Sequence, residues 1–247
     1  MSDLLVCAAN FHSTLAHVAM LAESCRFYGL TFGSFGETSP WEGFIKSKVL
    51  GLVEYIKAAK QPYVLSTDGW DVWMLADEKT ILDLYKSFEK PIVICGHKER
   101  YPARGRPVHY PEAPTRFRWV CSGQFIGERK ALLETLLFLG NNYSDLCDQG
   151  AWNKSIEKGE ITSVVEIDHY CKLFLTMAGI PLHRLHFDQE RRVVFEETNK
   201  NNFRPAYTGP AYQISSKPVS IHFAGGKGGS PNDMDMKSFY ETWMHNR

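Results

Sequence analysis

Short apolar runs alternate along the chain with longer segments in which apolar residues recur every three or four positions. The first run covers residues 3–9, a helical pattern from Leu15 to Cys25 follows with Ser13 as its cap, and a second run covers 30–35. Such runs are typical of buried strands. The recurrence of apolar residues every three or four positions in the segment between two runs is typical of an amphipathic helix. Strand, helix and strand in this order predict a βαβ unit with parallel strands and a right-handed crossover.

The same alternation continues to the end of the chain and predicts an α/β fold, a Rossmann-like sheet with helices on both faces. Further strands are expected at 63–65, 91–96, 161–167, 171–175, 193–195 and 218–223. Further helices are expected at 45–60, at 77–89, around Leu132–Leu137 after the stretch 119–128, and from about 232 onwards. No repeat or low-complexity linker divides the pattern, so we expect a single domain over residues 1–247.

Composition limits where the protein works and what it binds. The 247 residues are 44% apolar, which is enough for a large core, and their formal net charge is zero. A neutral chain has no overall field that draws it to nucleic acid or membranes, so any such preference must come from a local patch. The sequence has no signal-peptide pattern and no apolar run of transmembrane length, so we expect a cytoplasmic location and no membrane span. Six cysteines without a Cys-x-x-Cys pair are expected to be reduced core residues.

The most informative stretch follows the strand at 63–65. The apolar run leads to Asp68, and after Gly69 and Trp70 a second carboxylate follows at Asp71. In open α/β sheets, ligands bind outside the carboxyl ends of the strands. Two carboxylates three residues apart, on a tight turn that Gly69 allows, predict an Asp-x-x-Asp site for one divalent cation that acts as a Lewis acid on a diphosphate leaving group. The alternative is an ordinary solvated turn or a helix cap.

Other residues with nucleotide-binding chemistry lie beside a predicted strand end and a helix start. Ala9 and Asn10 end the first strand, where small side chains let a nucleotide approach the backbone. A plain strand-to-helix turn is the alternative for these two residues. Lys46 and Lys48 stand in the first turns of a helix, where the helix dipole disfavours cations. We interpret Lys46 as a solvated lysine, whereas a phosphate partner and solvation are both open for Lys48.

Small and acidic residues in the second half of the chain are further candidates. Ser122 and Gly123 precede an apolar triplet and let a bulky ligand pack against the backbone. Asp148 has the chemistry to hold a sugar hydroxyl or to orient an acceptor, and its alternative role is to cap the helix that follows. Asp168 ends the strand predicted at 161–167. We take Asp148 and Asp168 as the candidate catalytic acids.

Residues 97–118 form a long stretch without any period. The segment contains four prolines and six Lys or Arg residues against two acids, with aromatic residues between them. Long irregular segments in compact domains are usually functional or mobile. A basic segment beside an acidic metal site predicts contact with an anionic acceptor or with the donor's diphosphate, and arginines among aromatics also suit single-stranded or flipped nucleic acid. The alternative is a solvent-exposed surface loop without a binding role.

The last predicted strand leads into a glycine-rich stretch. His222 lies in the apolar run, and Gly225, Gly226 and Lys227 follow it closely. Bare backbone N–H groups with one lysine have the chemistry of a diphosphate cradle, and His222 has the chemistry of a third metal ligand. The spacing matches no Walker loop, which argues against a P-loop nucleotidase. A satisfied core histidine is the alternative.

Five stretches occur in an order that resembles the glycosyltransferase domain of procollagen lysyl hydroxylases. They are Thr67-Asp68-Gly69-Trp70-Asp71-Val72, residues 121–127, Asp148-Gln149, residues 167–174 and Ile221-His222. The resemblance covers nearly the whole chain and implies a GT-A fold and a manganese-dependent transferase that uses a UDP-sugar. It also implies Asp68, Asp71 and His222 as metal ligands, Trp41 and Lys48 near the donor, and Asp148 near the reacting sugar. The chain departs from the family at Cys147, where a second acid is usual, and at Gln124, where glycine is usual.

We therefore expect a nucleotide-sugar half at 1–96, a basic loop at 97–118, and an acceptor half with the C-terminal metal-ligand segment at 119–247. The expected activity is transfer of a sugar from a UDP-sugar to a hydroxyl group, with Mn²⁺ or Mg²⁺ as the cofactor. The residues expected around the donor are Ala9, Asn10, Trp41, Lys48, Thr67, Asp68, Gly69, Trp70, Ser122, Gly123, Gly225, Gly226 and Lys227.

The acceptor is the least constrained part of this hypothesis. In a more specific version of the hypothesis, the acceptor is a hydroxymethylated or otherwise modified DNA base, and the nucleic acid binds to the basic loop. A protein or lipid acceptor is the rival. A non-catalytic nucleotide-sugar-binding module is the alternative from another class of protein. The sequence leaves the sugar and the oligomeric state open.

Overall fold

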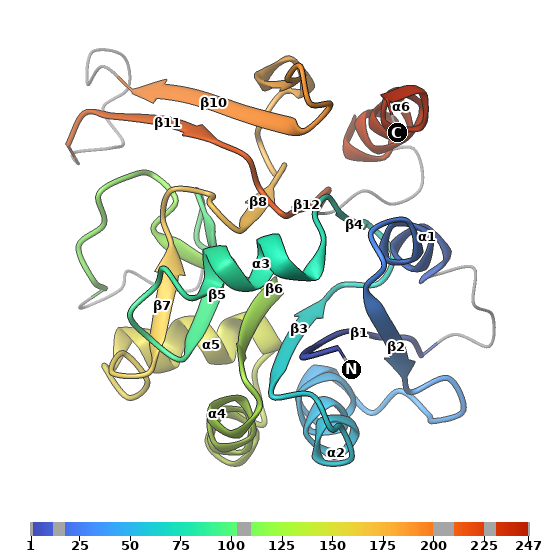
Figure 1. Cartoon of the computed structure of the whole chain (residues 1–247). Coiled ribbons are helices and arrows are strands. Elements are labelled where there is room, and N and C mark those ends of the chain that lie inside the picture. Colours follow the sequence, from blue (N-terminus) through green and yellow to red (C-terminus); the bar gives the residue numbers. More distant parts are fainter. Residues whose placement is uncertain (1, 12–17, 103–109, 200–209, 225–230, 247) are drawn as a thin grey trace.

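The computed structural model describes residues 2–11, 18–102, 110–199, 210–224 and 231–246 (Figure 1). Its centre is a six-stranded sheet with the order β2-β1-β3-β6-β5-β7. The strands are β1 (Leu4–Ala9), β2 (Thr31–Phe35), β3 (Tyr63–Thr67), β5 (Ile92–His97), β6 (Trp119–Glu128) and β7 (Val165–Asp168). β1 pairs in parallel with β2 and β3, as the βαβ pattern predicts, and β6 runs antiparallel to its neighbours β3 and β5. The α/β class expected from the sequence is confirmed.

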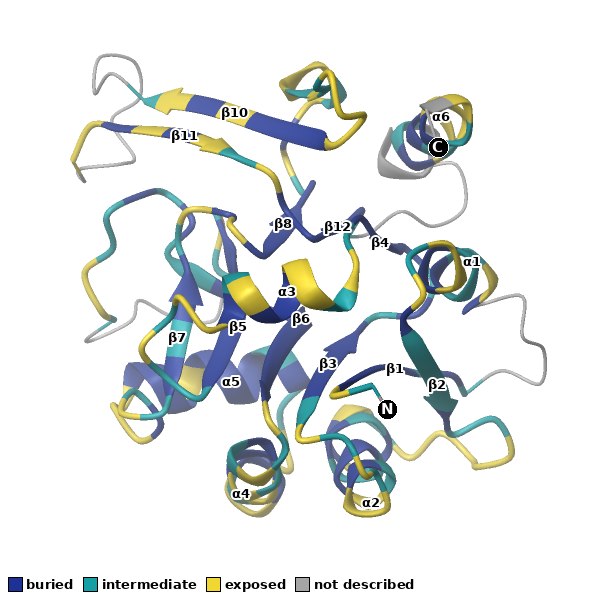
Figure 2. Cartoon of the chain, viewed as in Figure 1, coloured by how far each residue is buried: buried dark blue, intermediate teal, exposed yellow. Residues whose placement is uncertain are grey.

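Helices cover both faces of this sheet (Figure 1). On one face pack η2 (Phe44–Leu50), α2 (Gly51–Lys57), α4 (Arg129–Asn142) and α5 (Asp148–Glu157); on the other pack α1 (Ala19–Phe27) and α3 (Glu78–Tyr85). Alternate residues of β1 explain the two-sided core, because Leu5 and Cys7 join the first cluster whereas Leu4 and Val6 join the second. Figure 2 shows buried central strands and helices with exposed outer sides. The predicted helix cap Ser13 lies outside the described residues.

β6 is the element that the sequence pattern describes least well. The stretch 119–128 leads into a helix as expected, since α4 begins at Arg129, but the stretch itself forms a ten-residue strand between β3 and β5. Its residues 120–127 are all buried, and a strand inserted between two buried strands needs no polar face. Its register places Gln124 beside Thr67, and the N–H of Asp68 donates to the carbonyl of Gly123 at 2.8 Å. The strand therefore brings Gly123 to the end of β3.

Two three-stranded sheets lie above the central sheet in Figure 1. One has the order β4-β12-β8 and contains β4 (Val72–Met74), β12 (Ser220–His222) and β8 (Phe174–Thr176). The other has the order β11-β10-β9 and contains β11 (Tyr212–Ser216), β10 (Val193–Asn199) and β9 (Leu185–Phe187), which follows the short helix η3 (Leu182–Arg184). The sequence pattern does not predict β4, β9 or β11.

A third apolar cluster joins these sheets to the C-terminal helix α6 (Pro231–Asn246). Trp73 from β4, Phe195 from β10 and Phe239 from α6 are buried in it. The ring of Trp73 packs edge-on against Phe223, with centroids 5.9 Å apart. Because Phe223 directly follows β12, this packing keeps β12 against β4 near the end of β3.

Across the described part of the chain, no helix combines the length and the apolar character that crossing a membrane requires.

Candidate metal centre and active site

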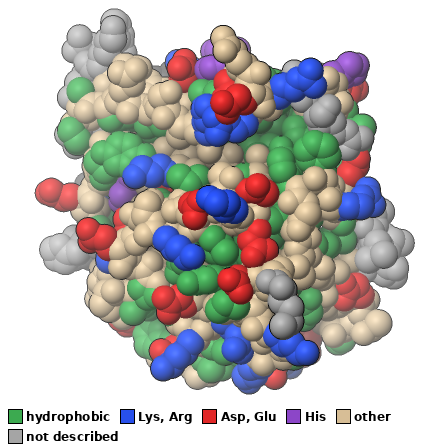
Figure 3. All heavy atoms as spheres, viewed as in Figure 1, with side chains coloured by type: hydrophobic (Ala, Val, Ile, Leu, Met, Phe, Trp, Pro, Cys, Tyr) green, Lys and Arg blue, Asp and Glu red, His purple; other side chains and the backbone are tan. Residues whose placement is uncertain are grey.

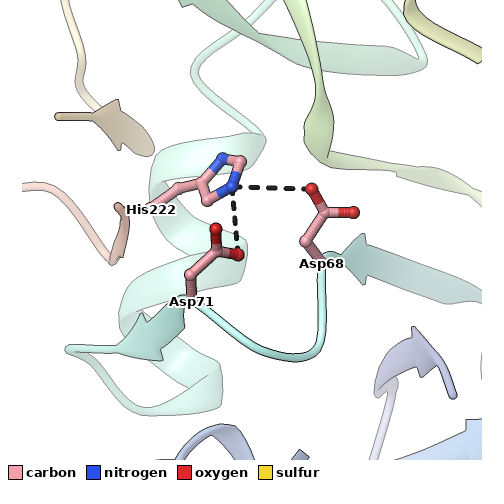
Figure 4. A group of neighbouring side chains, drawn as sticks. All are labelled: Asp68, Asp71 and His222. Atoms are coloured by element: carbon pink, nitrogen blue, oxygen red, sulfur yellow. Dashed lines mark ion pairs between the residues drawn. The ribbon is translucent and has the colours of Figure 1, made fainter. Parts of the chain in front are cut away.

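Asp68, Asp71 and His222 meet beyond the end of β3 (Figure 4). Asp68 follows β3, Asp71 directly precedes β4, and His222 is the last residue of β12. Nε2 of His222 lies 3.2 Å from Oδ1 of Asp71 and 3.5 Å from Oδ2 of Asp68. One possible ligand atom from each residue lies within 4.8 Å of the other two. The fold thus brings the three candidate ligands together from distant parts of the sequence.

Backbone pairing holds these three residues in place. His222 is the register partner of Val72 in the antiparallel pair of β12 and β4, which sets the imidazole beside Asp71. The N–H of Phe223 donates to the carbonyl of Asp71 at 2.8 Å and extends this pairing. Asp68 is fixed separately, through its backbone bond to β6. The short strand β4, which the sequence does not reveal, is therefore the link that positions His222.

Two positions in the site must be glycine because other atoms of the protein lie where a Cβ atom would be. A Cβ at Gly123 would lie 2.3 Å from Cε1 of His222 and 2.8 Å from Oδ2 of Asp68, which is too close for packed atoms. The protein's own ligand residues therefore occupy the space beside Gly123. A Cβ at Gly69 would lie 2.7 Å from Cγ1 of Val18. Since φ of Gly69 is not positive, the turn does not need glycine's backbone freedom as we expected, and glycine is needed for space instead.

The second ring nitrogen of His222 faces a cysteine. Nδ1 of His222 lies 3.6 Å from Sγ of Cys121 on β6. Burial disfavours a charged imidazole, but the Asp71 carboxylate outweighs burial and raises the pKa of His222 well above its ordinary value. The sequence predicts Cys121 only as a reduced core residue, because a strand pattern does not show which side chain meets a distant histidine.

Lys48 connects this cluster to a third carboxylate. Its Nζ lies 2.6 Å from Oδ1 of Asp68 and 2.7 Å from Oδ2 of Asp148. It lies in η2, a π-helical segment where the sequence predicts a regular helix, and π-turns are frequent at functional sites. Burial disfavours the ammonium, but the carboxylates of Asp148 and Asp68 outweigh burial and raise the pKa of Lys48 above its ordinary value. Lys48 is therefore a fixed positive charge between two acids.

Asp148 is the first residue of α5 and not its cap. Cys147 occupies the N-cap position, where its Sγ accepts a hydrogen bond from the N–H of Gly150 at 3.3 Å. The carboxylate of Asp148 is buried and accepts a hydrogen bond from Oγ of Ser122 at 2.9 Å, in addition to its contact with Lys48. The capping role that was the alternative for Asp148 thus belongs to its neighbour, and Asp148 is turned toward the site.

Asp168 makes a different set of contacts. It is fully buried at the end of β7, where Oδ1 accepts from the N–H of Lys172 at 2.9 Å. Oδ2 accepts from the N–H groups of Leu173 and Phe174 at 2.7 and 2.9 Å. Burial raises the pKa of Asp168, and hydrogen bonds from backbone N–H groups, that of Phe174 first, oppose the shift. These contacts suit a residue that shapes the turn between β7 and β8 better than a catalytic acid.

Several donor-site candidates lie around the acidic loop. Ala9 is the last residue of β1 and Asn10 follows it; the carbonyl of Ala9 would lie 3.4 Å from a Cβ at Gly69, so this strand end lies beside the loop. Thr67 is buried at the last position of β3, and Trp70 is half-buried between the two aspartates. The expected grouping of these residues at one strand end is therefore what the fold produces.

Trp41 contributes an exposed aromatic surface. It is 49% exposed, and its ring packs edge-on against Phe11 and Phe44 with centroids 5.1 and 5.2 Å apart. Phe44 and Lys48 belong to the same helical segment, in which they lie about one turn apart. The glycine-rich candidates Gly225, Gly226 and Lys227 lie outside the described residues.

The described parts of the basic segment, 98–102 and 110–118, contain no helix or strand, as the lack of a period predicts. Three of its cations contact groups of the protein itself: Lys98 pairs with Glu197, Arg100 lies 3.2 Å from Glu157, and Arg118 lies 4.8 Å from the ring centroid of Trp119. On the face shown in Figure 3, basic and acidic side chains are interspersed rather than gathered by sign. The segment is therefore less available to a polyanion than its composition indicates.

The chemistry of Asp68, Asp71 and His222 fits a divalent cation. Carboxylate oxygens suit Mn²⁺ and Mg²⁺, and an imidazole nitrogen is a common ligand of transition metals. The side chains of Asp71 and His222 are only 8% and 4% exposed, whereas that of Asp68 is 34% exposed. The cluster is thus enclosed on the protein side and open beside Asp68, where a ligand of the cation has room to bind.

The model of the PLOD GT-domain family matches residues 2–206. This chain belongs to the PLOD GT-domain family. It is 27% identical to procollagen-lysine,2-oxoglutarate 5-dioxygenase 1 of Mus musculus over 119 residues, which are 47% of this chain and 16% of that protein. It is 24% identical to the protein of the same name from Rattus norvegicus over 169 residues, 63% of this chain and 23% of that protein.

This chain therefore matches less than a quarter of the length of each of these curated relatives. A solved structure, a glycosyltransferase involved in the glycosylation of the major capsid of PBCV-1, has a TM-score of 0.52 and 10% identity. The match covers 96% of this chain and 98% of that one. It shows the fold alone and confirms the GT-A architecture that the resemblance implies. Family membership and fold together support glycosyl transfer as the activity.

One departure from the PLOD GT-domain pattern has a structural explanation. Gln124 is buried, and its Nε2 donates to the carbonyl of Leu175 at 3.4 Å. Its Oε1 accepts a hydrogen bond from the hydroxyl of Ser220. Gln124 therefore ties β6 to β8 and to β12, the strand that ends in His222.

Proposed function

We propose that this PLOD GT domain is a metal-dependent transferase that moves a sugar from a UDP-sugar to a hydroxyl group. The observation that supports this most strongly is the convergence of Asp68, Asp71 and His222 beside the Lys48–Asp148 pair. Departure of a nucleotide diphosphate builds negative charge on the phosphate oxygens and leaves the sugar carbon positive. The transition state therefore needs positive charge beside the phosphate and negative charge beside the sugar. Charged groups that the fold already holds in place usually contribute most to stabilising such a transition state.

The metal ligands in this proposal are Asp68, Asp71 and His222. We favour Mn²⁺ over Mg²⁺, because one of the three ligands is an imidazole nitrogen. When bound, such a cation supplies positive charge to the diphosphate leaving group. The exposed side of Asp68 is the direction from which the donor's phosphates would approach.

Lys48 and Asp148 have complementary roles in the proposal. The ammonium of Lys48, held within 2.7 Å of Asp68 and Asp148, would add a positive charge beside the departing phosphate. The carboxylate of Asp148 is oriented by Lys48 and by the hydroxyl of Ser122. It would stabilise the positive sugar or position the acceptor hydroxyl.

The donor's base would use the aromatic surface near η2. Trp41 and Phe44 are about half exposed, and aromatic rings of this kind bind a planar base by stacking. Ala9 and Asn10 would leave the backbone of β1 open to the ribose. In this proposal residues 1–96 form the nucleotide-sugar half and residues 119–247 form the acceptor half.

For the acceptor we retain a hydroxymethylated DNA base, with a protein or lipid hydroxyl as the rival. The cytoplasmic location expected from the sequence belongs to the same proposal, because modified DNA is met there. The described cations of the basic segment are mostly engaged with the protein, so a nucleic-acid acceptor would depend on those that are not.

Release of UDP from a panel of UDP-sugars in the presence of Mn²⁺ tests the proposed function. We expect slow release without an acceptor, loss of release with EDTA, and faster release when an oligonucleotide with hydroxymethylcytosine is the acceptor. Asp71→Ala should abolish release, whereas Asp145→Ala, which removes an exposed acid before α5, should not. Binding of UDP-sugars without turnover under every condition would identify a non-catalytic module instead.

A further inference from the structure

A polar pocket that contains none of the candidate active-site residues lies on the side of the molecule with β10 and β11. Its volume is about 320 Å³, and it is lined by β10 and β11 together with segments that follow β5 and β8. The charged residues that line it are Lys98, Glu99, Arg116, Arg184 and Glu197. Volumes from about 300 Å³ upward are typical of ligand sites. The pocket is therefore large enough for a small polar group of a larger ligand.

One wall of the pocket is a fixed ion pair. Lys98 pairs with one carboxylate oxygen of Glu197, and the other oxygen accepts from the hydroxyl of Tyr212 at 2.6 Å. Nζ of Lys98 also lies 5.0 Å from the ring centroid of Phe117. Lys98 thus neutralises the negative charge of Glu197, so Glu197 repels an anion in the pocket only weakly.

The two arginines of the lining are not balanced in this way. Among the residues that the structure describes, Arg116 and Arg184 form no ion pair. Burial lowers the pKa of Lys98, Glu197 opposes that effect, and the nearby charge of Arg116 lowers the pKa further. The pocket lining therefore contains three cations and two acids, one of which, Glu99, lies on the exposed rim. Because Lys98 and Glu197 pair with each other, Arg116 and Arg184 remain against the single acid Glu99, and the five charged residues carry one net positive charge.

The pocket adjoins the residues that position His222. The N–H of Met177 donates to the carbonyl of His222 at 2.7 Å, and the next two residues, Ala178 and Gly179, line the pocket. Figure 1 accordingly shows β10 and β11 above β8 and β12. Lys98 and Arg116 belong to opposite ends of the basic segment 97–118, so the described ends of that segment meet at the pocket.

We propose that this pocket binds a phosphate group of the acceptor through the guanidinium groups of Arg116 and Arg184. A guanidinium donates two parallel N–H···O bonds to one phosphate, and it stays charged at any pH the protein meets. Two arginines match a phosphate better than a single carboxylate. That the ligand is the acceptor rests on the proposed function, whereas binding of phosphate does not. The phosphate has two possible sources, a phosphomonoester on a small acceptor or a phosphodiester of nucleic acid.

Equilibrium binding to the full chain tests the proposal without turnover. Calorimetric titrations would use inorganic phosphate, glycerol 3-phosphate as the monoester, and an oligothymidylate as the diester, with excess Mn²⁺ and UDP to block the candidate donor site and with blank titrations into Mn²⁺ and UDP alone. We expect the double substitution Arg116→Gln and Arg184→Gln to weaken phosphate binding at least about tenfold, because two charge-assisted contacts are lost. Arg26→Gln, an exposed arginine of α1 away from the pocket, is the matched control and should bind as the unmodified protein does.

Each outcome has a defined meaning. Arginine-dependent binding that persists with Mn²⁺ and UDP supports the pocket, and the tighter of glycerol 3-phosphate and oligothymidylate identifies the phosphate source. Binding that UDP abolishes, that the double substitution leaves unchanged, or that is absent for all three probes overturns it. Arg184→Gln alone, at an exposed position on η3, covers the case in which the double variant does not fold. Failure of the proposed function would show separately, as absence of UDP release while phosphate still binds.

Discussion

Sγ of Cys121 lies 3.6 Å from Nδ1 of His222, the ring nitrogen that does not contact Asp68 or Asp71. For Nε2 to bind a cation its lone pair must be free, so the ring proton must reside on Nδ1 and the sulfur must accept it. Partners of this kind orient metal-binding histidines and fix their tautomer. Cys121 is therefore the positioning residue for His222 in the proposed centre.

Cys121→Ala should weaken Mn²⁺ binding about 10–100-fold, the usual effect of losing such a partner. Cys121→Ser keeps an acceptor and should lose much less. A titration followed by electron paramagnetic resonance measures the free ion directly. Cys25→Ala, at another fully buried cysteine in α1, controls for the loss of a core sulfur. Equal Mn²⁺ affinity in the Ala and Ser variants of Cys121 and in the unmodified protein would exclude the positioning role.

Gly123→Ala tests whether the space beside β6 is needed by the ligand residues. The added Cβ would lie 2.3 Å from Cε1 of His222, so the imidazole must move away from the aspartates. We expect loss of measurable Mn²⁺ binding and a destabilisation of about 1–3 kcal/mol, the usual cost of overpacking. Calorimetric titration and urea unfolding measure the two effects.

Gly51→Ala is the matched control for that substitution. Gly51 has helical backbone angles, and its nearest neighbour would be Cε2 of Phe35 at 3.3 Å from the new Cβ. It should retain Mn²⁺ affinity. If Gly123→Ala also binds Mn²⁺ normally, the metal ligands are not those that meet at Gly123.

Asp148→Asn separates the catalytic proposal from metal binding. The substitution keeps the size of the side chain and an acceptor for Ser122, but it removes the charge that faces Lys48. We expect UDP release to fall about 10²-fold or more, as when one preorganised electrostatic group is lost, while Mn²⁺ affinity is unchanged. Asp71→Asn should instead weaken both. A parallel loss of Mn²⁺ binding in Asp148→Asn would contradict the division of roles.

Much of the site could be predicted because its residues stand next to strong local signals. Asp68 and Asp71 follow a short apolar strand, and His222 lies in another, so each can be recognised from its own surroundings. Their meeting depends on β4, whose three residues show no period, and on its pairing with β12. Without the family resemblance, the sequence offers no physical reason to pair those two segments.

The parts that could not be predicted depend on which way side chains face across long sequence distances. Lys48 reaches two carboxylates because η2 is π-helical, and the apolar spacing there fits an ordinary helix equally well. Asp148 faces the site because Cys147 takes the cap, and cysteine is not among the usual capping residues. The antiparallel strand β6 was hidden because a strand buried on both faces has the same apolar run as a buried helix.

Asp168→Asn distinguishes a structural acid from a catalytic one. Three backbone N–H groups converge on the two oxygens of Asp168, and an asparagine offers one oxygen and turns an amide NH₂ toward the remaining donors. We expect a destabilisation of about 1–3 kcal/mol, because a buried donor loses its acceptor. UDP release per folded molecule, measured well below the unfolding temperature, should stay near that of the unmodified protein. If stability is unchanged and release collapses, Asp168 belongs to the chemistry after all, and the turn between β7 and β8 does not depend on its charge.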